Sequence, residues 1–565
     1  MLTFFRNIIL IFLLFANLSH SFSESNDPIR GKYGMVVSAS KIASQVGIDI
    51  LKKGGNAIDA AVAVGFALAV TYPSAGNIGG GGFMTIHLQN GISTTIDYRE
   101  NAPSSVNEFI YQDSIGNVLT EKSQFGVTST AVPGSVAGLI YALEKYGSLS
   151  LEEVIQPAID LAKDGFLLEY RLAQSINYEI DLFNQYESTK KIFTKNGIPF
   201  EEGELFIQKD LAKTLELIKK YGSSGFYEGE TAKLIAQQIN IDGGYINLND
   251  LKNYRPIERD PIITNYRGFE VITIGPPSAG GVTLLQMLNI LENFSFDKNA
   301  WGGSSYIHKL VETMKYSFAD RSMHIGDPDF YKVPLDWLLS KDYAKSLYLK
   351  IDSLAKPSID ILPGEENDFS ESEETTHYSI IDKNGNAVST TTTINSSYGS
   401  GVIVDGAGFF LNNEMDDFSS KPGVPNQFGL LGSEANKIEP NKRMVSSMSP
   451  TIILKDNKPY MIVGSPGGST ISTVVLQVIL NVLDFDMDMQ KAIDMSRIHH
   501  QWLPDKLFYE EFSLSLDVKK SLLNMNYIFG AERTLGRVEG IIVDSKNQIY
   551  LGATDPRGFG AAIGY

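Results

Sequence analysis

The chain has 565 residues, of which 43% are hydrophobic and 20% charged, so it can bury a large core and has the composition of a globular protein. Its 66 acidic and 48 basic side chains give a net charge of -18, which argues against nucleic acid and anionic membrane surfaces as partners. The absence of cysteine excludes disulfides, thiolate catalysis and cysteine-ligated metals, and we expect no lipoprotein anchor, which would need a cysteine.

The first residues have the pattern of a secretory signal. In MLTFFRNIILIFLLFANLSHSFSES, Arg6 precedes an apolar run over residues 8–16, and small residues follow. This run is too short to cross a bilayer. We therefore predict a signal peptide over residues 1–21, with an end between 21 and 25. We expect the mature protein to cross the inner membrane and to work without a membrane anchor in the bacterial periplasm, or otherwise outside the cell.

The first two thirds of the chain are predicted to be mainly helical. Residues 40–73 read as two alanine-rich helices broken at the glycines 54–55, and FMTIHL and TTIDYRE after them read as a hairpin. Long helical periodicity dominates residues 134–293, where several helices stop at a glycine.

The clearest break in the chain is the acidic run PGEENDFSESEE at residues 363–374, which we expect to be mobile and exposed. Short predicted strands follow it: HYSIID, AVSTTTTIN, GVIVDG, FFLNN, TIILK and MIVGS. Helices are predicted near residues 472–481 and 489–496. The expected fold class is therefore α/β (α+β), with mixed layers of sheet and helix.

The strand that begins at Thr375 is predicted to form a hairpin around residues 382–385. Asp-Lys-Asn-Gly fits a type I turn whose glycine lies in the left-handed region, giving a three-residue loop with a bulge. That register places Thr393 opposite Thr375, with Asn395 on the same face. A two-residue loop would place Ile394 there instead, so the pairing of the hydroxyls depends on the turn.

Threonine is common in strands, and this preference alone would explain the TTTT run. Free threonine is a weak nucleophile, but an N-terminal threonine carries its own amine, with a pKa of roughly 7.7 to 8.0. A cut between Glu374 and Thr375 would therefore place nucleophile and base on one residue. The acidic run would then become a released tail.

Several motifs in one order resemble a known family. TTHYSIIDKNGNAVSTTTTINSSYGSG, LNNEMDDFS, NKRMVSSMSPTI, GSPGGS and HHQWLPD, with GNIGGGGFM and DYRENAP before them, are similar to the γ-glutamyltransferases, which are N-terminal nucleophile hydrolases. The resemblance runs from about residue 29 to 565. It implies a four-layer αββα sandwich built from two chains after autocleavage. The helix-rich large subunit, residues 22–374, and the β-rich small subunit, residues 375–565, would stay together as a heterodimer.

The resemblance also implies the activity of a self-processing γ-glutamyltransferase and glutathione hydrolase. Thr375, oriented by Thr393, would form a γ-glutamyl ester from glutathione or another γ-glutamyl amide. Water, an amino acid or a dipeptide would then resolve that ester. No metal and no organic cofactor is expected.

A γ-glutamyl donor needs a cation for its α-carboxylate, an anion for its ammonium group and donors for its oxyanion. Taken alone, Arg99 would suit a surface ion pair, NNEMDD a solvated acidic turn, and the paired serines and glycines ordinary turns. The resemblance instead implies specific roles. It assigns the carboxylate to Arg99, Ser446 and Ser447, the ammonium to Asp417, Glu414 and Asn395, and the oxyanion to Gly467 and Gly468.

Three further motifs remain. The glycines at 79–82 lack the Lys-Ser/Thr of a phosphate loop, so we expect tight packing near the active site. His499 and His500 lack metal-ligand spacing, so we expect a structural role. Residues 421–432 resemble the family's lid over the glutamyl pocket. Phe428 stands where many members have tyrosine, which leaves lid gating and the balance between water and acceptor open.

Two rival functions are retained. A related glutaryl or cephalosporin acylase would share Thr375 but would need no ammonium clamp, so Asp417 and Glu414 argue against it. A secreted, non-catalytic binding protein of the same fold is the other rival. The intact Thr375, Thr393, Asn395 and both glycines argue against that function.

Overall fold

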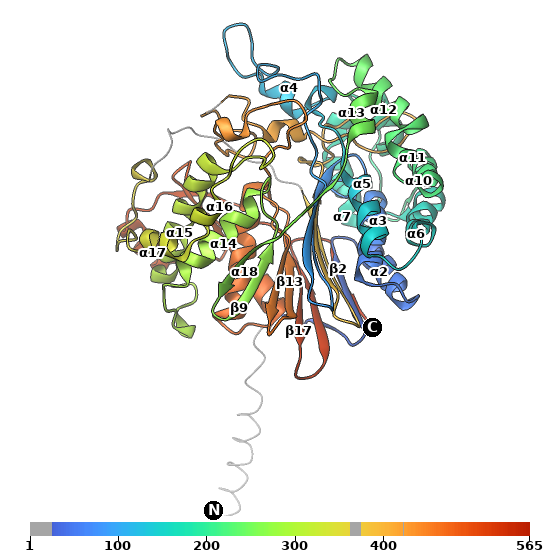
Figure 1. The fold of residues 1–565 in the computed structure, drawn as a ribbon. Helices are drawn as coiled ribbons and strands as arrows, with labels where there is room; N and C mark the ends of the chain where they lie inside the picture. The colour runs from blue at the N-terminus through green and yellow to red at the C-terminus, as the bar shows by residue number, and fades with distance from the viewer. Residues whose placement is uncertain (1–24, 362–374, 422) are drawn as a thin grey trace, which may run out of the picture.

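Two seven-stranded sheets lie face to face, and helices cover the outer face of each (Figure 1). The computed structural model describes residues 25–361, 375–421 and 423–565. The layers run helix, sheet, sheet, helix, which confirms the expected α/β class and the αββα sandwich. The predicted signal peptide, the acidic tail and Glu374 at the cleavage site lie outside the described residues.

The first sheet carries the predicted hairpin in its middle, and all of its neighbouring strands are antiparallel. In spatial order its strands are β19 (Ala561–Gly564), β2 (Gly34–Ser38), β10 (Thr376–Asp382), β11 (Ala387–Thr393), β3 (Gly81–His87), β4 (Ser93–Asp97) and β7 (Ile257–Arg259).

The second sheet is also antiparallel throughout. Its strands, in spatial order, are β1 (Ile29–Gly31), β18 (Ile549–Thr554), β17 (Glu539–Asp544), β13 (Lys458–Gly464), β12 (Thr451–Lys455), β9 (Phe269–Thr273) and β8 (Ile262–Tyr266). Two small sheets complete the fold: β14 (Ile498–His499), β15 (Leu507–Tyr509) and β16 (Phe529–Glu532); and β5 (Phe166–Leu167) with β6 (Leu205–Phe206).

The helices form two outer layers. The layer on the first sheet is built around α3, whose every residue is buried, and contains α2 (Lys41–Lys52), α3 (Ala57–Thr71), α5 (Ser135–Tyr146), α6 (Leu151–Asp164), α10 (Lys209–Tyr221) and α12 (Gly229–Ile241). The layer on the second sheet contains α14 (Ala279–Leu291), α15 (Ser304–His324), α18 (Ile471–Leu483) and α19 (Met489–Asp494).

Shorter helices fill the connections: α4 (Thr120–Gln124), α7 (Tyr170–Tyr178), α8 (Ile180–Phe183), α9 (Glu187–Phe193), α11 (Ser224–Tyr227), α13 (Leu248–Asn253), α16 (Leu335–Leu338), α17 (Lys341–Tyr348) and α20 (Leu516–Asn524). None of the helices in the described part of the chain is both long and apolar enough to span a bilayer.

The two sheets share one core and one set of chain segments. Each sheet contains strands from before residue 361 and from after residue 375. Their facing sides are joined by a buried aliphatic cluster, and each such side chain contributes roughly 1.5 to 3 kcal/mol when it leaves water. The cluster includes Met35, Val37, Ile272, Ile381, Ile452, Ile462 and Ile541. Both parts of the chain therefore depend on the same core.

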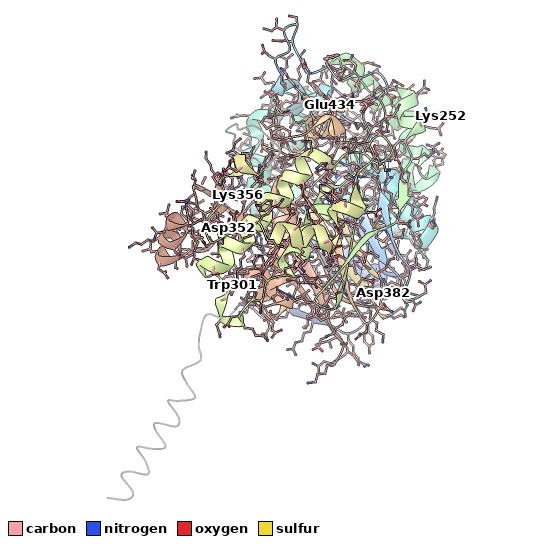
Figure 2. The ribbon with its side chains drawn as sticks, turned by 60° about the vertical axis from the view of Figure 1, so that its left-hand side comes forward. Lys252, Trp301, Asp352, Lys356, Asp382 and Glu434 are labelled. Atoms are coloured by element: carbon pink, nitrogen blue, oxygen red, sulfur yellow. The ribbon has the colours of Figure 1, made fainter. Side chains whose placement is uncertain are left out.

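The hairpin of β10 and β11 has the predicted register. Asp382 donates its N–H to the carbonyl of Asn386 at 3.1 Å, and Gly385 has φ of 86°. Pairing continues outward to Thr376 opposite Thr392. Figure 2 shows the turn residue Asp382 toward one end of the molecule and Glu434 toward the other.

Two predictions about local structure were wrong. GVIVDG and FFLNN are not strands, and only an isolated bridge between Ile403 and Phe410 joins them. Gly401, Gly406 and Gly408 all have φ between 76° and 79°, which interrupts the extended runs. Helices dominate residues 134–293, as predicted, and this region also contains the strands β5 to β9.

Candidate active site

The two predicted hydroxyl groups meet at the open end of the hairpin. Thr375 lies just before β10 and Thr393 ends β11. The Oγ1 of Thr375 donates to the Oγ1 of Thr393 at 3.5 Å, and Thr393 Oγ1 also accepts the N–H of Asn395 at 2.7 Å. Thr375 is only 5% exposed. The hairpin thus buries a hydroxyl pair at one end of the sandwich.

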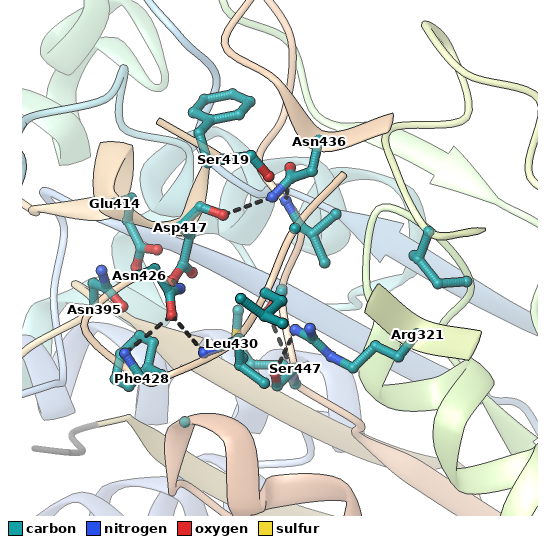
Figure 3. Close-up of a pocket in the computed structure, with 18 of the residues that line it drawn as sticks. Arg321, Asn395, Glu414, Asp417, Ser419, Asn426, Phe428, Leu430, Asn436 and Ser447 are labelled. Carbon is teal, nitrogen blue, oxygen red and sulfur yellow. Dashed lines mark hydrogen bonds between the residues drawn. The ribbon is translucent and has the colours of Figure 1, made fainter. Parts of the chain in front are cut away.

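A pocket lies over these threonines and collects most of the predicted site residues (Figure 3). Its wall includes Arg99, Thr375, Thr393, Asn395, Glu414, Asp417, Phe428, Ser446, Ser447 and Gly468. Gly467 adjoins Gly468 but does not line the pocket. Residues from both sheets, from α15 and from residues 421–432 therefore converge on one space.

The Gly467-Gly468 pair connects β13 to the helix α18. Their φ angles are 132° and 48°, values that side chains other than glycine rarely adopt. Neither backbone N–H has a hydrogen-bond acceptor within the residues that the structure describes. Two adjacent free donors at the wall of a pocket suit a developing oxyanion.

Arg99 is fully buried just after β4, and carboxylates surround it. Its guanidinium lies 2.6 Å from a carboxylate oxygen of Glu414 and 3.4 Å from one of Glu100, and it forms a third ion pair with Asp417. Glu414 and Asp417 lie on one 3₁₀ turn, Glu414–Asp417. Arg99, predicted to bind a carboxylate, therefore forms ion pairs with Glu414 and Asp417, which were predicted to bind an ammonium group.

Burial dominates the electrostatics of this cluster. It raises the pKa of Glu414 well above its ordinary value and that of Asp417 also upward, although the positive charge of Arg99 opposes both shifts. Burial also raises the pKa of Glu100 to about 7. Burial alone would lower the pKa of Arg99, but the neighbouring carboxylates raise it overall. The cluster thus holds protons as well as charge near neutral pH.

Asn395 presents an acceptor to the pocket. Its Nδ2 donates to the carbonyl of Asn413 at 3.0 Å, which leaves its Oδ1 available to a ligand. This orientation fits the predicted contact with an ammonium group.

The two serines lie on the loop that leads into β12. Ser446 Oγ accepts the N–H of Met448 at 3.1 Å, and the backbone N–H of Ser446 donates to the carbonyl of Pro277 at 3.1 Å. Ser447 Oγ accepts from the Nη2 of Arg321 at 3.1 Å. Both hydroxyls are held by local contacts and border the pocket.

Three pocket residues were missed from the sequence. Arg321, on the last turn of α15, points into the pocket toward Ser447 (Figure 3). Asn426 Nδ2 donates to Asp417 Oδ1 at 3.3 Å, and Asn436 Nδ2 donates to the Asp417 carbonyl at 2.7 Å. Asn426 lies within residues 421–432, whereas Asn436 lies outside the motifs described above, and no spacing rule connects either asparagine to Asp417.

A fourth missed residue, Asn77, holds the end of the hairpin formed by β10 and β11. Asn77 Nδ2 donates to the carbonyl of Thr393 at 2.9 Å, and its Oδ1 accepts the N–H of Gly80 at 2.9 Å and the hydroxyl of Ser135 at 2.7 Å. In the sequence, the signal for this role was its place two residues before the glycine run.

The glycines at 79–82 pack tightly against the site, as predicted. A Cβ at Gly80 would lie 2.1 Å from the carbonyl oxygen of Thr393, and one at Gly79 would lie 2.1 Å from the carbonyl oxygen of Phe410. Since no side chain fits, this run allows β3 and the chain before it to approach β11 closely.

His499 and His500 are both bonded within the protein, consistent with a structural role. His499 Nε2 lies 3.0 Å from Gln501 Oε1, and His500 Nε2 lies 3.2 Å from Asp505. Gln501 Nε2 in turn donates to the carbonyl of Phe428 at 3.1 Å. Within residues 25–361, 375–421 and 423–565, no group of three His, Asp or Glu side chains is placed to hold a metal.

Residues 421–432 cover the pocket. Asn426 Oδ1 accepts the N–H of Phe428 at 3.0 Å and of Leu430 at 3.1 Å, forming a tight turn. The Phe428 ring is 4% exposed and lies so close to Gly468 that a Cβ there would approach it to 2.9 Å. The aromatic cover is thus present without a hydroxyl.

Comparisons with known proteins agree with this geometry. A family model described as Gamma-glutamyltranspeptidase matches residues 43–565. The glutathione hydrolase proenzyme of Escherichia coli (strain K12) is 47% identical over 532 residues, covering 94% of this chain and 91% of that protein. The glutathione hydrolase proenzyme of Pseudomonas sp. (strain A14) is 44% identical and covers 99% of both chains.

Solved structures show the same fold. The Helicobacter pylori gamma-glutamyltranspeptidase is 42% identical, with a TM-score of 0.57, and covers 61% of this chain and 97% of that chain. The cephalosporin acylase from Bacillus halodurans has a TM-score of 0.85 at 28% identity and covers 97% of this chain and 98% of that chain. The match of the family model over residues 43–565, together with these relatives, shows that the chain belongs to the gamma-glutamyltranspeptidase family.

Proposed function

We propose that Thr375 is the nucleophile with which this chain, a γ-glutamyltransferase and glutathione hydrolase, first cuts itself and then cleaves γ-glutamyl amides. The observation that carries this proposal is the buried hydroxyl pair of Thr375 and Thr393 in a pocket that also holds Arg99 and Asp417. The hydroxyls offer a nucleophile with a partner. The charged groups offer contacts for the two ends of an amino acid.

In the first reaction the Oγ of Thr375 attacks the carbonyl carbon of Glu374. The bond between the Glu374 carbonyl carbon and the Thr375 nitrogen breaks, and the acyl group moves from nitrogen to oxygen. The nitrogen keeps its own proton and takes the proton of the hydroxyl, which makes it a free amine. Water then hydrolyses the ester and gives back the Thr375 hydroxyl with a carboxylate on Glu374. The products are a large subunit of residues 22–374 and a small subunit of residues 375–565, which remain a heterodimer because both sheets contain strands of each.

In the second reaction the same hydroxyl attacks the γ-carbonyl carbon of glutathione or a related γ-glutamyl amide. The N-terminal amine of Thr375 takes the hydroxyl proton and passes it to the nitrogen of the thiol-containing leaving dipeptide as the amide C–N bond breaks. Thr393 orients the nucleophile, and the N–H groups of Gly467 and Gly468 stabilise the oxyanion. Water, an amino acid or a dipeptide then attacks the γ-glutamyl ester and releases Thr375.

Two separate groups of residues hold the carboxylate and the ammonium group at the α-carbon of the donor. Arg99, Ser446 and Ser447 bind the carboxylate, and Asp417, Glu414 and Asn395 bind the ammonium group. The family relation and the shared pocket support these roles. Burial raises the pKa of Glu414 well above its ordinary value, and we assign the charged contact with the ammonium group to Asp417.

The proposal also includes a lid over the glutamyl pocket and the location of the protein in the cell. Phe428 and its neighbours act as a lid over the glutamyl pocket. We propose a signal peptide over residues 1–21 and work in the periplasm, or otherwise outside the cell, without a membrane anchor. The apolar run at residues 8–16 supports the signal peptide.

A cephalosporin-type or glutaryl acylase is the alternative that the fold itself favours, since the solved acylase covers nearly the whole chain. Its 28% identity lies well below the 47% of the glutathione hydrolase proenzyme. An acylase also needs no anion for an ammonium group, whereas Asp417 borders this pocket.

One experiment tests both reactions. Purified full-length protein is examined by gel electrophoresis and N-terminal sequencing, and its rates on γ-glutamyl and glutaryl p-nitroanilide are compared. We expect two bands, the smaller starting at Thr375, and a strong preference for the γ-glutamyl donor. A single intact active chain would exclude the processing scheme, and a preference for the glutaryl donor would identify an acylase.

A further inference from the structure

Arg321 is a buried cation that has no carboxylate partner among the residues that the structure describes. It stands on the last turn of α15, is 9% exposed, and directs its guanidinium into the pocket (Figure 3). Its Nη2 donates to Ser447 Oγ at 3.1 Å. Within the described ranges no Asp or Glu oxygen lies within 4.0 Å of it, whereas Arg99 forms ion pairs with three carboxylates.

The two arginines therefore differ in the charge that they offer to a ligand. The carboxylates of Glu100, Glu414 and Asp417 offset the positive charge of Arg99. Arg321 retains its charge: burial lowers its pKa to about 10, partly opposed by Asp417, so it remains protonated near neutral pH. A buried charge without an anion is unfavourable, and an incoming carboxylate would relieve that cost.

The hydrogen bond from Arg321 also fixes the direction of the Ser447 hydroxyl. A guanidinium can only donate, so Ser447 Oγ must accept. The single O–H proton of Ser447 then points elsewhere, and it has no acceptor among the residues that the structure describes. Because Ser447 lines the pocket, that proton is free for a ligand oxygen.

We propose that Arg321 is a positioning residue that makes the pocket selective for donors carrying an α-carboxylate. It holds Ser447 as a hydrogen-bond donor to that carboxylate and supplies the positive charge that Arg99, already paired, does not. The inference rests on the proposed function, because it takes the donor to be a γ-glutamyl compound. It adds a residue on α15 to a carboxylate site otherwise formed by Arg99 and the serine loop.

The test uses three p-nitroanilide donors that differ at the α-carbon. The γ-glutamyl donor has both groups, the 4-aminobutanoyl donor lacks the carboxylate, and the glutaryl donor lacks the amine. We expect Arg321→Met to raise the KM for the γ-glutamyl and glutaryl donors about tenfold or more, with little change in kcat. The kcat/KM for the 4-aminobutanoyl donor should stay within twofold of wild type.

Further variants separate positioning from a general effect on structure. Arg321→Lys should restore part of the lost affinity, because it keeps the charge but not the fork of donors. Ser447→Ala should weaken the γ-glutamyl donor, and combining it with Arg321→Met should cost clearly less than the product of the two single losses. Arg267→Met, which removes a partly exposed arginine paired with Asp484, is the matched control and should leave donor selectivity unchanged.

Self-cleavage and the thermal midpoint are measured on every variant. If Arg321→Met does not mature, the comparison between Arg321→Lys and wild type decides the matter with the same donors. Equal losses on carboxylate-bearing and carboxylate-free donors would overturn the proposal, and so would independent effects of the Arg321 and Ser447 substitutions. Failure of the proposed function is distinct, because it would appear as a wild-type enzyme without γ-glutamyl activity.

Discussion

The Oγ1 of Thr375 lies 3.5 Å from the Oγ1 of Thr393 at the open end of one hairpin, in the middle of a seven-stranded sheet. β10 pairs with β11 from Thr376 and with β2 from Tyr378 onward, so the strand that follows Thr375 lies inside the sheet. Such a central position limits the movement of the hydroxyl. In the proposed mechanism Thr375 acts first on its own backbone and then on a substrate, and both reactions benefit from this fixed geometry.

Replacing the nucleophile should block both reactions. We expect Thr375→Ala to remain a single chain with no activity on γ-glutamyl p-nitroanilide, because the attacking oxygen is absent. Thr375→Ser keeps that oxygen and should mature, although its hydroxyl lacks the methyl group that restricts rotation. Gel electrophoresis over time and N-terminal sequencing measure the outcome. Cleavage of Thr375→Ala at the same bond would remove Thr375 from the mechanism.

Asp417→Asn should separate maturation from turnover. The substitution leaves the threonine pair intact, so self-cleavage should proceed. It removes the charged partner of the donor's ammonium group, and the loss of about 2 to 5 kcal/mol corresponds to a fall in kcat/KM of about 30-fold or more. Steady-state kinetics with the γ-glutamyl donor check this result. Glu434→Gln, an exposed carboxylate beyond the lid, is the control, and unchanged kinetics of Asp417→Asn would contradict the assignment.

Gly80→Ala should disturb the site without touching a polar group. The added methyl would lie 2.1 Å from the Thr393 carbonyl oxygen, so the backbone of β11 must shift. We expect slow or absent self-cleavage and a lower thermal midpoint, in line with about 1 to 3 kcal/mol for overpacking. Gly303→Ala, whose Cβ would meet its first neighbour only at 3.2 Å, serves as the control. Normal maturation of Gly80→Ala would show that the close approach is unimportant.

The bond from Gln501 Nε2 to the Phe428 carbonyl should hold the lid closed. Gln501→Leu removes this hydrogen bond, which contributes about 1 kcal/mol, together with the bond between Gln501 Oε1 and His499 Nε2, so the lid should open several-fold more often. Limited proteolysis followed by mass spectrometry should then detect faster cutting within residues 421–432. Gln45→Leu on the surface helix α2 provides the comparison. Equal cutting rates for both variants would mean that other contacts hold the lid.

Asp416 should make stability depend on pH. Its carboxylate accepts the Gln427 N–H at 2.9 Å and the Ser123 hydroxyl, yet burial raises its pKa to about 6. The folded state then binds a proton more tightly than the unfolded state, whose pKa is the ordinary 3.8. The free energy of unfolding should therefore fall as pH rises from about 4 to 6, by up to about 3 kcal/mol, and level off above.

Asp416→Asn cannot titrate, so it isolates this contribution. We expect the thermal midpoint of wild type, measured relative to Asp416→Asn, to decrease between pH 4 and pH 6 and then to stay constant. Asparagine can still accept the Gln427 N–H while donating to Ser123, so the variant should fold. Midpoint curves that run parallel across this range would contradict a raised pKa.

The hairpin and its register could be predicted from the sequence, because the residues that determine the turn type lie within the turn itself. Asp382 and Gly385, which define the loop, are only three residues apart. The pairing of Thr375 with Thr393 then follows by counting outward from the turn. The error at GVIVDG has the opposite cause. Its alternating apolar residues favour a strand, but the surrounding chain needs turns at Gly401 and Gly406.

The role of Arg321 could not be predicted from the sequence, because it depends on packing between distant segments. It is 126 residues away from Ser447 in the chain, and on α15 it would read as one of many charged helical residues. The mutual pairing of Arg99, Glu414 and Asp417 was equally hidden. The motifs assigned these three residues to opposite ends of a ligand. Only the folded structure shows that Arg99 forms ion pairs with Glu414 and Asp417.

The interleaving of the two chain parts within both sheets has a consequence for how the protein must be made. Separate expression of residues 22–374 and 375–565 would leave each with unpaired strand edges, because β2, β3 and β9 belong to one part and β10, β11 and β12 to the other. Such edges pair with other chains and aggregate. Folding has to come before cutting, and the peptide bond lost at maturation serves chiefly to deliver both halves to the same place at the same time.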